Sequence, residues 1–113
     1  MALLRVSGLP TAASAATAAF HADWLDQAVA LLEPGDDLVL LFPAADHTHT
    51  AWRLAAVQSL AREHAPLRVN GLASSDEAAI TAALAYLSAA DGVTGQLLSL
   101  DSAGAGTVVL PAS

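Results

Sequence analysis

The stretch that most constrains the fold is residues 60–72, LAREHAPLRVNGL, because it takes the chain from an apolar helix into a short strand. The helix is expected to end at His64-Ala65-Pro66, since proline lacks the N–H that a helix needs and disfavours helical backbone in the residue before it. Residues 67–72 then predict a strand. Helices that pass directly into strands are typical of α/β proteins.

The same alternation runs along the rest of the chain. Strands are predicted at residues 2–6, 38–42, 67–72 and 96–100, and helices at residues 20–32, 50–64 and 76–90. Residues 38–42 are all apolar, which is typical of a parallel strand covered on both faces. We therefore expect one α/β domain over residues 1–113, with a four-stranded, mainly parallel sheet and about three helices.

Local structure can also be predicted for three shorter stretches. Residues 11–19 are rich in Ala with scattered Thr and Ser, and we expect a loop or a frayed first turn there. Ser74 and Glu77 have the spacing of a capping box before the third helix. Residues 107–110 are predicted to add an edge strand to the sheet of this chain or of a partner.

Two strings resemble the short-chain dehydrogenase/reductase family. Residues 60–72 are similar to the LAxExAPxxRVN string that leads into the sixth strand of that Rossmann-type fold, and residues 93–101, VTGQLLSLD, are similar to its last strand. The resemblance implies the C-terminal half of the fold only, a truncated form with three layers and strand order 1-2-3-4. It also implies that the first two helices cover one face of the sheet and the third covers the other, through an unusual left-handed last crossover.

Charge and composition exclude several classes of partner. Four Arg, no Lys and eleven acidic residues give a net charge of −7, which repels phosphate backbones and anionic lipids, so neither nucleic acid nor a membrane is expected as a partner. The chain has no Cys and therefore no disulfide or thiolate site. Without an 18-residue apolar span or a signal-type N-terminus, a cytoplasmic location is expected.

The residues that carry the family's chemistry are replaced. Counting back without gaps from residues 60–63 puts Asp46 at the Tyr position and Thr50 at the Lys position of the family's Tyr-x-x-x-Lys pair. The only Tyr is Tyr86, on the third predicted helix, and the Pro-Gly that follows the family's RVN strand is replaced by Ser74-Ser75. We therefore expect no catalytic residue and no enzymatic activity.

No cofactor is expected either. A dinucleotide site needs G-x-G-x-x-G between a first strand and a helix. The one G-x-G, at residues 104–106, follows the last predicted strand and predicts a connector.

Asp46, His47 and His49 form the one constellation left, at the carboxyl end of a strand, where α/β sheets place ligands. Such residues bind Zn²⁺ or transfer protons, but two imidazoles and one carboxylate lack a fourth donor. A solvated loop with a capping Asp or Thr is the favoured interpretation. The alternative is a small-ligand-binding protein or a metal-assisted enzyme that uses this loop.

The favoured function is that of a pseudoenzyme, a non-catalytic subunit that associates with a partner. The resemblance implies that the first two helices contact a neighbouring subunit, in a homodimer or higher homo-oligomer or with a full-length short-chain dehydrogenase. The second helix is apolar on more than one side. We expect Leu54, Val57 and Ala61 to face the sheet and Trp52 to lie at the centre of the subunit interface. Ala56 and Ser59 are expected beside Trp52 in that interface.

Overall fold

The computed structural model describes residues 1–100 and 108–109. Within these residues one sheet has the strand order β1-β2-β3-β4-β5. The strands are β1 (Ala2–Arg5), β2 (Leu38–Phe42), β3 (Val69–Ala73), β4 (Leu97–Leu100) and β5 (Val108–Val109). The first four pair in parallel, which confirms the predicted order, and β5 adds the expected edge strand, antiparallel to β4.

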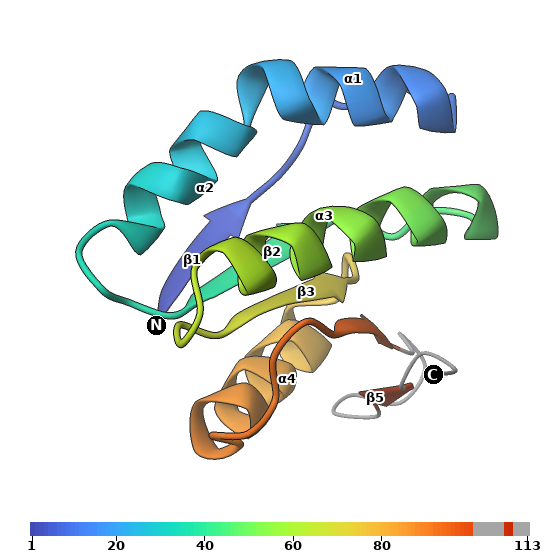
Figure 1. The fold of residues 1–113 in the computed structure, drawn as a ribbon. Helices are drawn as coiled ribbons and strands as arrows, with labels where there is room; N and C mark the ends of the chain where they lie inside the picture. Colours follow the sequence, from blue (N-terminus) through green and yellow to red (C-terminus); the bar gives the residue numbers. More distant parts are fainter. Residues whose placement is uncertain (101–107, 110–113) are drawn as a thin grey trace.

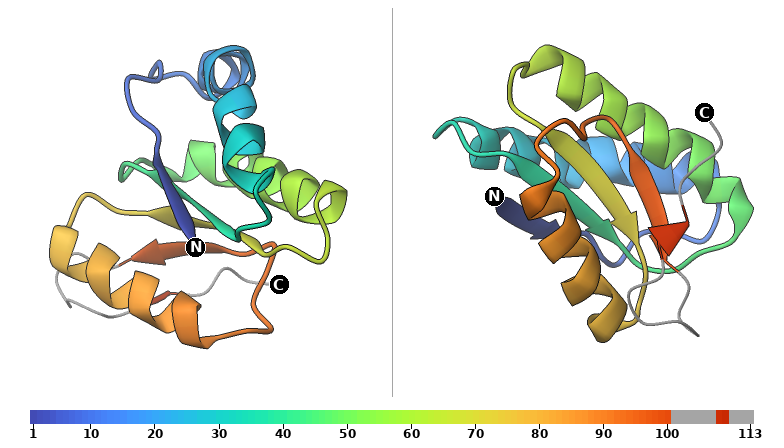
Figure 2. Two further views of the ribbon diagram at one scale, coloured as in Figure 1. Left: turned by 90° about the vertical axis from the view of Figure 1, so that its left-hand side faces the viewer. Right: turned by 90° about the horizontal axis from the view of Figure 1, so that it is seen from below.

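The helices cover both faces of the sheet, in three layers (Figures 1 and 2). They are α1 (Ala13–Asp23), α2 (Leu25–Leu32), α3 (Thr50–Glu63) and α4 (Glu77–Ala89), with the 3₁₀ turn η1 (His47–His49) before α3. Helices α1, α2 and α3 lie on one face and α4 lies on the other. Because the strands follow one another in a single direction, the crossover through α4 has the opposite hand to the two before it, as the resemblance implied.

The N-terminal helical region differs from the expectation. A loop or a frayed first turn was predicted for residues 11–19, but α1 begins at Ala13 and buries Ala16 and Phe20. The predicted single helix over residues 20–32 is two helices that meet at Trp24. The high helix propensity of Ala explains the early start, and the helix count is four where about three were expected.

The core consists of two apolar clusters, one on each face of the sheet. Leu38, Leu40 and Phe42 of β2 pack with α1, α2 and α3, whereas Val39 and Leu41 pack with α4. Successive side chains of a strand point to opposite faces, so a strand that contributes to both clusters must be apolar at every position. This arrangement accounts for the unbroken apolar run of residues 38–42.

The two strings that carry the family resemblance bind each other. Asn70 donates from Nδ2 to the carbonyl of Val93 at 2.9 Å and accepts from the backbone N–H of Gln96 at 3.1 Å. The hydroxyl of Thr94 accepts from the backbone N–H of Val69 at 3.1 Å. The RVN and VTGQ strings are therefore two halves of one junction between β3 and the segment that enters β4.

Arg68 extends this junction to the end of α4. Its Nε donates to Asp37 Oδ2 at 3.0 Å, and its Nη1 donates to the carbonyls of Leu87 and Ala90 at 3.0 and 2.6 Å. Carbonyls in the last turn of a helix have no partner within the helix, and a cation there is also favoured by the helix dipole. Arg68 thus anchors the C-terminus of α4 to the loop before β2.

The cap of α4 is Asp76 and not the predicted Ser74–Glu77 box. Asp76 Oδ1 accepts from the backbone N–H groups of Ala78 and Ala79. Ser74 Oγ instead accepts from the backbone N–H of Asp76, in the loop before the helix. Asp76 is the capping residue because it immediately precedes the first helical residue, and from there its carboxylate reaches the free N–H groups of the first turn. In the part of the chain that the structure describes, no helix is long and apolar enough to cross a membrane.

Candidate functional site

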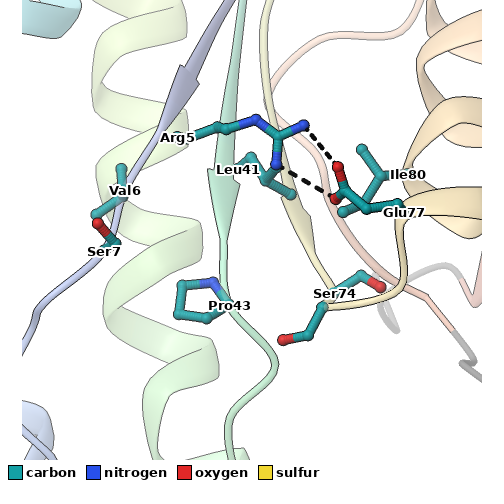
Figure 3. A pocket seen from close by; sticks show the side chains of 9 residues that line it. Arg5, Val6, Ser7, Leu41, Pro43, Ser74, Glu77 and Ile80 are labelled. Atoms are coloured by element: carbon teal, nitrogen blue, oxygen red, sulfur yellow. Dashed lines mark hydrogen bonds and ion pairs between the residues drawn. The ribbon is translucent and has the colours of Figure 1, made fainter.

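Two cavities open where parallel strands end at their carboxyl edges. The first, of about 340 Å³, lies beside the start of α4, and its lining includes Arg5, Pro43, Ser74 and Glu77 (Figure 3). The second, of about 290 Å³, lies between the loop after β1 and the loop after β2, and His49 and Arg53 contribute to its wall. Parallel α/β sheets bind ligands at this edge.

An ion pair crosses the first cavity from β1 to α4. Arg5 Nη2 lies 3.0 Å from Glu77 Oε1, and Arg5 Nη1 lies 3.3 Å from Glu77 Oε2. Both side chains are more than half exposed, so the pair contributes little to stability. Ser75 Oγ accepts from the N–H of Ala44, which joins the loops after β2 and β3. No His lines this cavity, so it offers no imidazole for proton transfer.

The three candidate residues Asp46, His47 and His49 are not brought together as ligands. Asp46 caps η1, where its Oδ1 accepts from the backbone N–H of Thr48 at 2.9 Å and from the Thr48 hydroxyl. These hydrogen bonds, the side-chain one foremost, hold the pKa of Asp46 below its ordinary value. His47 is exposed, whereas His49 is buried.

Both ring nitrogens of His49 are already in use. Trp52 Nε1 can only donate, so Nδ1 of His49, 3.0 Å away, must accept and carries no proton. The other nitrogen, Nε2, therefore carries the proton and donates to the carbonyl of Thr11 at 2.8 Å. His49 is thus a neutral tautomer that ties α3 to the loop before α1, and neither nitrogen is free to bind a metal. Residues 1–100 contain no group of three His, Asp or Glu placed to hold a metal ion.

Arg53, which was not among the predicted site residues, is only 5% exposed. Its helical spacing was the available signal, because Arg53, Ala56, Val57 and Leu60 recur at i, i+3, i+4 and i+7 and form the buried stripe of α3. The Arg53 guanidinium lies 4.8 Å from the centre of the Phe42 ring, and its Nη1 donates to the carbonyl of Pro43 at 2.9 Å.

The expected interface residues of α3 have different surroundings. Ala56 is 7% exposed and belongs to the same core cluster as Val57, against which Leu54 and Ala61 also pack; its place in a subunit interface stays a prediction. Trp52 is half-buried, with ring centres 5.6 Å from those of both Phe20 and Phe42. Ser59 is half-buried as well. Trp52 therefore has a packing role within the chain, and its contact with a second chain stays a prediction.

The glycines that could form a phosphate loop do not lie together in the described residues. The three glycines with left-handed backbone, Gly8, Gly35 and Gly95, fall in three separate loops and form no shared phosphate loop. Residues 104–106, the one G-x-G, lie outside the described residues. The only Tyr, Tyr86, is exposed on α4, across the sheet from α3.

Comparison with known proteins identifies a family. The family model described as short chain dehydrogenase-like protein (SDR-like) matches residues 4–100, which contain β1 to β4 except the first residues of β1. Neither the comparison with curated proteins nor that with solved structures gave a match. The family model spans both strings of the β3–β4 junction and most of the chain. The chain therefore belongs to the short chain dehydrogenase-like family.

Proposed function

We propose that this chain is a non-catalytic, cytoplasmic member of its family that acts by associating with another protein chain. The observation that carries the proposal is the replacement of the catalytic pair on an otherwise family-like scaffold. Asp46 caps a turn and Thr50 begins α3 at the two positions in question, and the sequence contains no Lys. A carboxylate held ionised and a Thr cannot replace a Tyr whose pKa is lowered by a neighbouring ammonium group.

The outer edge of β1 supports the association part of the proposal. The N–H of Ala2 donates to the carbonyl of Asp37, and the N–H of Val6 donates to the carbonyl of Leu41. Because backbone groups alternate in direction along a strand, those of Leu3 and Arg5 point away from β2. No strand among residues 1–100 and 108–109 pairs with that edge. Exposed edges of this kind pair readily with another strand.

A second copy of the chain is the partner that we favour, because two β1 edges can pair symmetrically about a twofold axis. A full-length short-chain dehydrogenase is the alternative partner. The metal-assisted alternative has less support, since both nitrogens of His49 are occupied.

Sedimentation equilibrium of the purified chain at micromolar concentration tests the proposal. We expect at least twice the chain mass of 11.4 kDa. Leu3→Pro removes an outward N–H and should weaken association at least ten-fold, because proline is tolerated at strand edges but cannot donate. Leu3→Ala is the matched control, since it also loses the half-buried side chain but keeps the N–H.

A single-chain mass for the wild type would contradict self-association. If a full-length dehydrogenase then co-purified with the chain from native extract, the partner would be that enzyme. Equal association of Leu3→Pro and Leu3→Ala would exclude the β1 edge as the contact. Turnover of a carbonyl or alcohol substrate with a nicotinamide cofactor would overturn the non-catalytic assignment.

A further inference from the structure

We propose that the cavity between the loops after β1 and β2 binds a small monocarboxylate through Arg53. This inference goes beyond the proposed function and does not rest on association.

Arg53 has hydrogen-bond donors that the chain itself leaves unused. A guanidinium has five N–H donors, and Arg53 uses one of them, from Nη1 to the carbonyl of Pro43. Its Nε is buried and has no hydrogen-bond partner. Buried donors without acceptors are rare in proteins and are costly, so each calls for an explanation.

Arg53 also lacks a counter-ion of its own. Arg5 pairs with Glu77 and Arg68 pairs with Asp37, but no carboxylate among the described residues forms an ion pair with Arg53. The rings of Phe42 and Trp52 lie 4.8 and 5.8 Å from its guanidinium carbon and compensate part of the charge. A buried charge without an anion is the arrangement that a bound anion would complete.

The cavity brings an anion next to Arg53, which is one of its lining residues, although the Nε itself has almost no exposed surface. Its volume of about 290 Å³ suits a small ligand, and apolar side chains, among them Leu9, Pro10 and Ala45, line it beside Arg53. A ligand with one charged group and a compact apolar body matches this lining.

Charge selects a carboxylate over a phosphate. Arg53 supplies the single positive charge, since His49 is fixed as a neutral tautomer, and the Asp46 carboxylate also lines the cavity. A dianion would be repelled by Asp46 without a second cation to offset it. A monocarboxylate needs only one cation and matches the planar fork of a guanidinium.

NMR titration of the full chain with sodium benzoate tests the proposal directly. We expect the Nε–H resonance of Arg53 and the backbone N–H resonances of Gly8 and Ala45 to shift saturably, while the Nε–H of Arg62 does not shift. Benzamide has the same shape without the charge and should bind at least ten-fold more weakly. Inorganic phosphate should bind more weakly than benzoate at the same residues.

Two variants separate the site from general charge effects. Arg53→Met should reduce benzoate affinity at least ten-fold, whereas Arg62→Met removes an exposed charge from the same helix and should leave the affinity unchanged. If Arg53→Met does not fold, the Arg53 Nε–H shift in the wild-type chain still decides the question. The proposal is overturned if benzoate does not shift that resonance saturably, if benzamide binds equally well, or if phosphate binds more tightly.

Discussion

At Gly71, α3 packs directly against the backbone of β3. A Cβ added there would lie 2.9 Å from both Val57 Cγ2 of α3 and Leu97 Cδ1 of β4. Gly71 itself is buried on β3, between β2 and β4. Its lack of a side chain thus sets the distance between helix and sheet, and with it the position of Arg53 one turn before Val57.

We expect Gly71→Ala to lower the free energy of unfolding by roughly 1–3 kcal/mol, because Val57 and Leu97 must move to admit a methyl group. Urea denaturation measures the change. Gly92→Ala is the control and should stay within about 0.5 kcal/mol, since a Cβ at Gly92 meets nothing within 4 Å. Equal effects of the two substitutions would contradict the close approach of α3 and β3.

Trp52 links packing and hydrogen bonding at one position. Trp52→Ala removes a ring packed on Phe20 and Phe42 and leaves His49 Nδ1 without its donor, so we expect a loss of about 2–4 kcal/mol in the free energy of unfolding. Trp52→Phe keeps much of the ring packing and should lose less. Denaturation and sedimentation of both variants measure these effects.

The same experiment tests the predicted subunit contact. If Trp52→Ala leaves the free energy of unfolding unchanged but weakens association ten-fold, Trp52 acts at an interface and not in the packing of its own chain. Reduced stability with unchanged association of the folded fraction would place its role within the chain.

At the scale of elements, the junction around Arg68 joins three parts of the chain. Asp37 precedes β2, Arg68 precedes β3, and the carbonyls of Leu87 and Ala90 end α4. The backbone N–H of Arg68 donates to Asp37 Oδ1 at 2.7 Å and is the main cause that holds the pKa of Asp37 below its ordinary value. The guanidinium adds to this effect, and partial desolvation opposes it.

The lowered pKa predicts acid sensitivity with a definite sign. Asp37 binds a proton more readily in the unfolded chain than in the folded one, so its contribution to stability is present above the unfolded pKa, near 3.8, and is lost as the pH falls through the folded pKa. We expect Asp37→Asn to cost roughly 1–3 kcal/mol at pH 7. Below about pH 4 the difference between Asp37→Asn and the wild type should shrink.

Urea denaturation at a series of pH values measures this difference. Asp36→Asn is the control, since Asp36 is an exposed neighbour with the same charge. A stability gap between Asp37→Asn and the wild type that is constant from pH 7 to pH 3 would contradict the role of the Asp37 carboxylate.

At the scale of the whole molecule, the scaffold of the family is present without a dinucleotide loop in the described part of the chain. The left-handed glycines lie in separate loops, and Ser74-Ser75 stands where the family's Pro-Gly follows β3. We therefore expect no saturable binding of NAD(H) or NADP(H) at millimolar concentration in calorimetry. Saturable heat from either nucleotide would contradict this expectation. Benzoate, added to the same preparation, tests the Arg53 cavity independently.

The architecture could be predicted from the sequence. The apolar run of residues 38–42 and the alternation of helices and strands predicted a parallel sheet, while the resemblance of the LAREHAPLRVN and VTGQ strings implied the strand order and the face on which each helix lies. The positions of helices and strands are local features, because the period of the apolar pattern and the positions of Pro and Gly decide which backbone can form. The start of α1 was missed because an Ala-rich segment with few large apolar residues gives no periodic signal.

The roles of the polar residues could not be predicted, because they depend on how the chain packs. Asp46, His47 and His49 are adjacent in sequence, yet η1 turns His49 inward to Trp52 and Thr11 and leaves His47 in solvent. Arg53 falls within the helix predicted over residues 50–64, but its burial beside a cavity follows from the packing of α3 on Phe42. Burial, tautomer and hydrogen-bond partner depend on segments far apart in the chain, so a local pattern cannot specify them.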